Sequence, residues 1–201
     1  LKDVFYFPGG KIDYDVQSNS AQDSNRLWMQ SLTPISHLCN AYESTKEKKY
    51  LQRIDRLLKD WEAYAVRGKN KYLWFDHTVA NRVHTLIYYY VLADSAKLFD
   101  DHQKRHLVEL LARHADFLAD PKNYSNYNHG VMMDKALLLV SLFLKPSLPD
   151  HSREWYTIAI HRISNDFQRD YTPSRIHIEN STSYHFYVTR HFSQMVELLN
   201  Y

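Results

Sequence analysis

The fold is decided by one stretch, residues 128–144, which reads NHGVMMDKALLLVSLFL. After its first three residues the stretch is almost wholly apolar, and Pro146 and Pro149 follow it closely. Because proline removes a backbone N–H and clashes with the preceding turn, the pattern predicts a buried helix that stops at Leu144. The longest apolar run, residues 136–144, is well short of the roughly 20 residues that cross a bilayer. We therefore expect a core helix and no membrane span.

Apolar residues recur at steps of three and four on both sides of this stretch, which is typical of amphipathic helices. Besides the helix at 128–144, helices are predicted near 25–44, 47–66, 76–99, 101–119, 151–170 and from Asn180 or Ser181 to Tyr201. Asp76 and Asn128 are candidate N-caps of their helices. Residues 1–24 look irregular, and 174–179 is the best candidate for a short strand.

Seven helices with short connections predict an all-α domain of consecutive antiparallel hairpins. A chain of 201 residues is one domain by default, 1–201, and its 4 Gly and 6 Pro are too few for the many turns of an all-β fold. No tetratricopeptide or ankyrin pattern appears at its period. The last predicted helix runs to the end of the sequence without a stop signal, so we expect the front part of a longer protein.

Composition argues against several classes of function. The formal net charge is only +2, with Lys and Arg spread along the chain, so we expect no nucleic-acid partner. Cys39 is the single cysteine and cannot form an internal disulfide, which leaves the compartment open. His102 and His106 lie four residues apart, but no Glu follows His102 as the zinc-protease motif requires. With no glycine-rich phosphate loop either, we expect no metal and no cofactor; the oligomeric state stays open.

Polar residues gather at three predicted helix starts, in residues 74–84, 124–130 and 179–187. Asn128 and His129 lie where free backbone N–H groups and the helix macrodipole attract anions. The alternative is that Asn128 is only an N-cap. Tyr184, in the first turn of the last helix, is either a functional residue or a core tyrosine. His77 shares one helical face with the residues four and seven positions after it.

Three motifs in these clusters occur in the order W-x-x-H-x-x-x-x-R, then N-H, then E-x-S-x-x-Y-H. This order resembles the helical domain of heparinase II/III-type and related alginate lyases. The residues concerned are Trp74, His77 and Arg82; Asn128 and His129; and Glu179, Ser181, Tyr184 and His185. Each motif is short, but their order and the 55 residues from His129 to Tyr184 make the set moderately specific.

The resemblance implies an incomplete (α/α) toroid followed by a β-sandwich domain. It also implies β-elimination of a uronic-acid polysaccharide, in an extracellular or periplasmic location. Tyr184 is then the general acid or base, while Asn128 and His129 neutralise the substrate carboxylate. The implied substrate-binding residues are Arg82, His77, Trp74, Glu179 and His185. Related enzymes draw a further catalytic residue from the β-sandwich, so we expect this chain to bind its acidic polysaccharide without full turnover.

Two other functions fit the same residues. The first is a non-catalytic carbohydrate-binding or capsule-assembly module on the same toroid, in which Tyr184 and His129 do not face one another across a cleft. The second is a helical protein-interaction scaffold, which predicts an apolar concave face. The sequence does not name the polymer, because heparinoid, alginate, hyaluronan-like and capsular polysaccharides all fit.

Overall fold

A computed structural model describes residues 12, 14, 22–174, 176–178 and 181–200. These residues form eight α-helices and a short 3₁₀-helix, η2 (Pro121–Asn123), and no β-strand. The α-helices are α1 (Gln22–Gln30), α2 (Thr33–Thr45), α3 (Lys49–Ala65), α4 (Asp76–Ser95), α5 (Asp101–Ala119), α6 (Asn128–Leu144), α7 (Pro149–Asp170) and α8 (Thr182–Leu199). The expectation of an all-α chain is therefore confirmed over the described residues.

The prediction of seven helices is wrong by one, because the stretch 25–44 contains two helices. Leu32, between α1 and α2, has φ 58° and ψ 30°, a left-handed conformation that ends a right-handed helix. Pro34 follows in the first turn of α2, where its missing N–H interrupts no helical hydrogen bond. The apolar period continues across this break, so periodicity alone does not reveal it.

The other helix boundaries follow the predictions closely, and two helices, 101–119 and 128–144, match them residue for residue. The helix predicted at 76–99 ends earlier, at Ser95, and Lys97 just beyond it is left-handed with φ 55°. The described residues of the strand candidate 174–179 form no strand. They contribute one isolated antiparallel bridge, between Tyr171 and His177.

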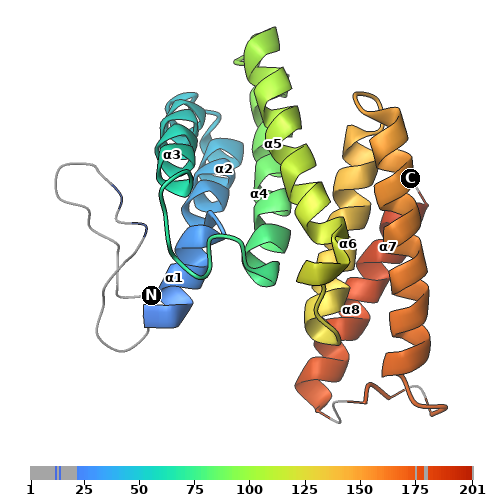
Figure 1. Cartoon of the computed structure of the whole chain (residues 1–201). Coiled ribbons are helices and arrows are strands. Elements are labelled where there is room, and N and C mark those ends of the chain that lie inside the picture. Colours follow the sequence, from blue (N-terminus) through green and yellow to red (C-terminus); the bar gives the residue numbers. More distant parts are fainter. Residues whose placement is uncertain (1–11, 13, 15–21, 175, 179–180, 201) are drawn as a thin grey trace.

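The helices alternate between two directions (Figure 1). Helices α2, α4, α6 and α8 run the same way and pack successively against one another. Helices α3, α5 and α7 run in the opposite direction, and each packs on the helix before it in the chain. As a result, the N-terminal ends of α4, α6 and α8 meet at one end of the molecule, the lower end in Figure 1.

Helix α6 is the centre of the core, as its sequence predicts. It packs against α4, α5, α7 and α8, and its fully buried side chains include Met133, Leu137 and Leu138. Burying a side chain of this size contributes about 1.5–3 kcal/mol. No helix in the described part of the chain is long and apolar enough to cross a membrane. Because α6 packs against four other helices, its N-terminus and the polar residues there have a fixed position in the fold.

Candidate functional site

Helices α6 and α8 pack against each other, and their contacts include residues near both N-termini. The Tyr187 hydroxyl of α8 donates to Sδ of Met132 on α6 at 2.8 Å, a contact between residues 55 apart in sequence. Farther along the same pair of helices, Nζ of Lys135 donates to Oε1 of Gln194 at 2.6 Å. Tyr184 and His129 each lie one turn before Tyr187 and Met132 respectively. Because α6 and α8 run in the same direction, the turns that carry Tyr184 and His129 are the next ones toward the N-termini of these two packed helices.

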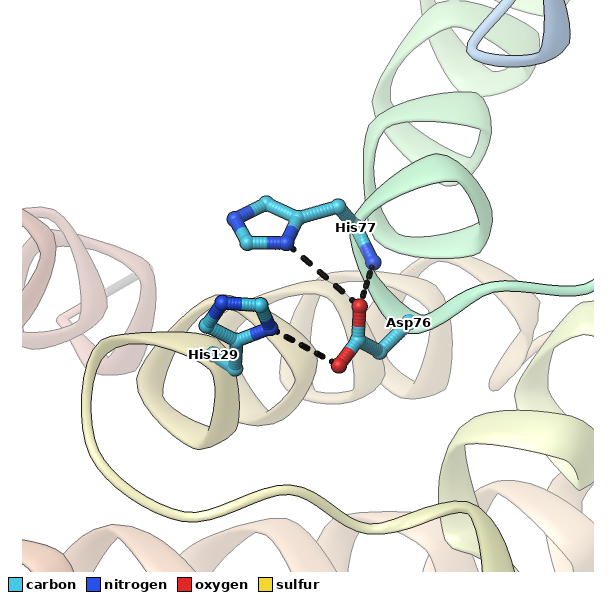
Figure 2. Close-up of side chains that lie close together, drawn as sticks. All are labelled: Asp76, His77 and His129. Atoms are coloured by element: carbon cyan, nitrogen blue, oxygen red, sulfur yellow. Dashed lines mark hydrogen bonds and ion pairs between the residues drawn. The ribbon is translucent and has the colours of Figure 1, made fainter. Parts of the chain in front are cut away.

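A buried carboxylate links α4 to α6 at the same end of the molecule (Figure 2). Asp76 is 6% exposed, and its Oδ2 lies 2.9 Å from Nδ1 of His129, 53 residues away in sequence. The Ser125 hydroxyl also donates to Oδ2, at 2.7 Å, and the backbone N–H of His77 donates to Oδ1 at 2.6 Å. The two imidazole rings meet edge to face, with centroids 4.0 Å apart. Asp76 thus fixes the position of the His129 ring.

The electrostatics of this cluster keep Asp76 ionised. Burial alone favours the neutral acid, but the hydrogen bonds from His77, His129 and Ser125 outweigh burial and hold the pKa of Asp76 well below its usual range. An ionised carboxylate only accepts hydrogen bonds, so Nδ1 of His129 carries the proton and donates. Figure 2 shows the other ring nitrogen, Nε2, directed away from Asp76. His129 can therefore offer Nε2 to a bound molecule while Asp76 orients the ring.

The backbone of the loop before α6 determines where Ser125, Asn128 and His129 lie. Tyr127, the N-cap of α6, has φ 61° and ψ −142°, a backbone conformation that residues other than glycine rarely adopt. Gly130 is required for close packing, because a Cβ there would lie 2.5 Å from the carbonyl oxygen of Ser125. Asn128 is the first helical residue and not the N-cap, and Asp76 has the same place in α4. Both N-cap expectations are therefore wrong, whereas Ser181 does cap α8, accepting from the N–H of Tyr184 at 3.5 Å.

A second carboxyl pair supports the connection from inside the protein. The Tyr124 hydroxyl lies 3.0 Å from Oδ2 of Asp134 and 2.8 Å from Oδ2 of Asp166. A single hydroxyl proton cannot serve two carboxylates, so one carboxyl group must hold a proton. Burial, and then the charge of Asp166, raises the pKa of Asp134, which makes Asp134 the protonated partner. This pair joins α6 to α7 beneath the loop that carries Ser125.

Arg82 does not lie in the candidate site, contrary to the role implied for it. Its side chain is 0% exposed and donates to the carbonyl oxygens of Gln30 at 2.6 Å and Leu73 at 2.7 Å. Its Nε–H also donates to Nε2 of the buried His114 at 2.9 Å. The guanidinium group has no surface with which to contact a substrate carboxylate. In this structure Arg82 joins α4 to α1, to α5 and to the segment before α4.

Trp74 and His185 also pack away from the Asp76 cluster. The Trp74 ring contacts the rings of His114 and Phe117 on α5, at 5.2 and 5.6 Å between centroids. Nδ1 of His185 accepts from the backbone N–H of His177 at 3.3 Å, so His185 holds the segment before α8 onto the helix. Glu179 lies outside the described residues. Tyr184 is 46% exposed, which leaves its ring accessible at the surface.

Three contributors to the site were not identified from the sequence. Asp76 was assigned only a capping role, and Ser125 and Phe75 were not singled out. The Phe75 ring lies 6.0 Å from the ring of His77 and 6.3 Å from that of His129, between centroids. The only signal for these residues is their position beside predicted helix starts, which by itself does not distinguish caps from ligands.

Comparisons with known proteins add one finding to this geometry. Neither a curated protein nor a solved structure gave a significant match to the chain. The family model described as heparinase II/III N-terminus matches residues 2–201, nearly the whole sequence. The match covers all three motifs and every helix of the structure. The chain therefore belongs to the heparinase II/III N-terminal family.

Proposed function

We propose that this chain is the toroid domain of a polysaccharide lyase that cleaves a uronic-acid-containing polysaccharide by β-elimination. One observation supports the proposal most: α6 and α8 contact each other through Met132 and Tyr187, one turn beyond His129 and Tyr184, and His129 is held by Asp76. The alternation of helix directions supports the toroid, because an α/α toroid is built from consecutive antiparallel hairpins in two layers. Family membership supports a protein related to the polysaccharide lyases.

The chemistry of β-elimination suits this arrangement. A base removes the proton at C5 of the uronate, a C4–C5 double bond forms, and the C4–O glycosidic bond breaks. Negative charge builds up on the adjacent carboxylate, so groups that neutralise it lower the barrier. We assign this role to Asn128 and His129, at the free N-terminus of α6. Asp76 is a positioning residue that orients the His129 ring with Nε2 outward.

We assign proton transfer to Tyr184. Its phenol hydroxyl can donate to the leaving glycosidic oxygen, and its phenolate can take the C5 proton. The Tyr184 ring is exposed one turn before Tyr187, which contacts α6, and we propose that a sugar bound to Asn128 and His129 reaches its hydroxyl. The rings of Phe75 and His77 pack against the ring of His129, and we propose these two residues, in place of Trp74 and Arg82, as the groups beside the substrate.

The test is Tyr184→Phe in the natural full-length protein, assayed on alginate, heparin and hyaluronan by the absorbance of the unsaturated uronate product. Loss of the hydroxyl should lower the rate by about 10²–10⁴-fold, the usual contribution of a positioned acid or base. Tyr156→Phe is the matched control, because Tyr156 is also a partly exposed helical tyrosine, 36% exposed on α7. It should keep the full rate.

Three outcomes would count against the proposal. A folded Tyr184→Phe protein with a normal rate would make Tyr184 a surface tyrosine without a catalytic role. Uronate binding without product from any of the polymers, in the unaltered protein, would favour the non-catalytic carbohydrate-binding module. Equal binding of a neutral glucan, measured by calorimetry, would point the same way.

A further inference from the structure

Three side chains of metal-ligating type converge from two helices at the candidate site. One ligand atom each from Asp76, His77 and His129 can be chosen so that all three lie within 4.8 Å of one another. Asp76 and His77 begin α4, whereas His129 begins α6, and Figure 2 shows both rings on the same side of the carboxylate. Two imidazoles and one carboxylate are the donor set of zinc sites that keep a fourth position open.

The distances between the potential ligand atoms of Asp76, His77 and His129 are suitable for a small metal ion. Zinc bonds of about 2.0–2.1 Å in tetrahedral geometry place ligand atoms about 3.3–3.4 Å apart. Nδ1 of His77 lies 3.4 Å from Oδ1 of Asp76, and Nδ1 of His129 lies 2.9 Å from Oδ2. The backbone already brings all three ligands together, so small side-chain rotations are enough to place them around one ion.

His77 has an unexplained feature that a metal ion would account for. Its Nδ1 atom is buried and lies 3.4 Å from Oδ1 of Asp76, in a contact whose geometry does not meet that of a hydrogen bond. A buried polar atom without a well-formed hydrogen bond costs about 1–3 kcal/mol, so such atoms are rare unless something binds them. The position of Nδ1 of His77 relative to Oδ1 of Asp76 is poor for a hydrogen bond, but it allows both atoms to bind the same cation.

The surroundings hold the ligands in place and leave one side open. Ser125 and the backbone N–H of His77 fix the Asp76 carboxylate, as outer-shell donors do in metal sites. The Phe75 ring packs against both imidazoles. The side chains of His77 and His129 remain 21% and 36% exposed, so a fourth ligand can reach the ion from solvent.

We propose that Asp76, His77 and His129 bind one divalent transition-metal ion of the zinc class, through the carboxylate and the two Nδ1 atoms. Imidazole nitrogens favour zinc and its neighbours over Mg²⁺ and Ca²⁺, which prefer all-oxygen ligands. The ion replaces the Nδ1 proton of His129 and leaves Nε2 outward, so the site does not depend on the proposed lyase activity. The proposed metal site differs from the expectation of no metal that was drawn from the sequence, because the only histidine pair considered there was His102 and His106.

The test is Zn²⁺ titration of the chelator-treated, tag-free protein by calorimetry, with Co²⁺ as a spectroscopic probe. We expect one equivalent of Zn²⁺ to bind, and Co²⁺ to give the intense visible bands of four- or five-coordinate ligation. Outer-shell changes weaken metal binding about 10–100-fold, so Ser125→Ala should fall in that range and the loss of a ligand in His77→Ala should cost at least about 100-fold. His77→Gln, closer in size, checks that the loss does not reflect misfolding.

His102→Ala is the control, because His102 and His106 lie four residues apart on α5 and form an alternative surface chelate. It should bind Zn²⁺ as the unaltered protein does. Undiminished stoichiometric binding by folded His77→Ala, loss of binding in His102→Ala, or no stoichiometric binding by the unaltered protein would each overturn the proposal. Lyase activity enters none of these measurements, so the result stands apart from the test of Tyr184.

Discussion

Replacing Arg82 by alanine should lower the stability of the folded protein. It should not act by removing a contact with the substrate. The guanidinium group is fully buried and lies between two tryptophan rings, with its central carbon 4.8 Å from the centroid of Trp61 and 5.4 Å from that of Trp74. Burial lowers the pKa of Arg82 to about 9, because no carboxylate among the described residues pairs with it. Its three hydrogen bonds and the two tryptophan rings therefore compensate for the burial of its charge.

The magnitude follows from those three hydrogen bonds. Arg82→Ala leaves the carbonyl oxygens of Gln30 and Leu73 and Nε2 of His114 without a donor, at about 1–3 kcal/mol each. Removing a buried, unpaired cation returns several kcal/mol. The cavity left between the two tryptophan rings adds to the loss, and the balance is a destabilisation of about 3–5 kcal/mol, at the high end for single substitutions. For a domain of this size that corresponds to a melting temperature lower by about 6–20 °C.

The assay is urea unfolding followed by circular dichroism at 222 nm and by tryptophan fluorescence. Arg113→Ala is the matched control, because Arg113 is an exposed arginine of α5 on the same Trp74 ring, at 5.9 Å. Losing an exposed cation–π contact should change the free energy of unfolding by only about 0.5–1 kcal/mol. If Arg82→Ala kept a normal urea midpoint but lost uronate binding, the burial argument would be refuted and Arg82 would reach the substrate.

Two further predictions concern charge at the same end of the molecule. Because burial and then Asp166 raise the pKa of Asp134, the folded state binds that proton more tightly than the unfolded chain. The free energy of unfolding should therefore fall as pH rises above about 4, and urea midpoints at pH 4.5 and 7.5 should differ less in Asp134→Asn; an equal difference contradicts this. Asn128→Asp should leave stability unchanged or raise it by up to about 1 kcal/mol, since it adds an acid at a helix N-terminus, yet it should weaken uronate binding by repulsion. Thermal unfolding and calorimetry measure the two effects, and unchanged binding would exclude Asn128 from the site.

Most of the helical framework could be predicted, because apolar periodicity and proline positions are local properties of the chain. Helix α6 is the clearest example: its apolar run predicts that it is buried, and the prolines that follow predict where it ends. The break at Leu32 could not be predicted, because a left-handed residue other than glycine or asparagine leaves no mark in the sequence. The N-caps were placed one residue late for a similar reason: Asp76 and Asn128 are good capping residues that here lie inside the helix.

The candidate site could be predicted only in part. The sequence spacing from His129 to Tyr184 equals the spacing between Met132 and Tyr187, which contact each other across α6 and α8, so the proposed pairing agrees with the packing of these helices. The contact between Asp76 and His129 depends on how α4 packs against α6, which no local pattern encodes. Arg82 was misassigned because an arginine among aromatic residues has the same sequence signature whether it binds a ligand or is buried.

The proposed position of the site also agrees with the charges at the helix N-termini, because an acidic side chain compensates the partial positive charge of some N-termini but not of others. Of the parallel helices that meet there, α4 carries an acidic residue in its first turn, whereas α6 and α8 carry none. An N-terminus holds roughly half a positive charge, and in α4 the ionised Asp76 accepts from the N–H of His77, the second residue of the helix, and compensates this charge. Neither α6 nor α8 has an acidic residue in its own first turn: Asp76 reaches only the His129 side chain of α6, and the neutral Ser181 hydroxyl caps one N–H of α8. Those two ends carry Asn128, His129 and Tyr184, and we therefore expect an anionic substrate to bind there by the helix N-termini and not by an arginine.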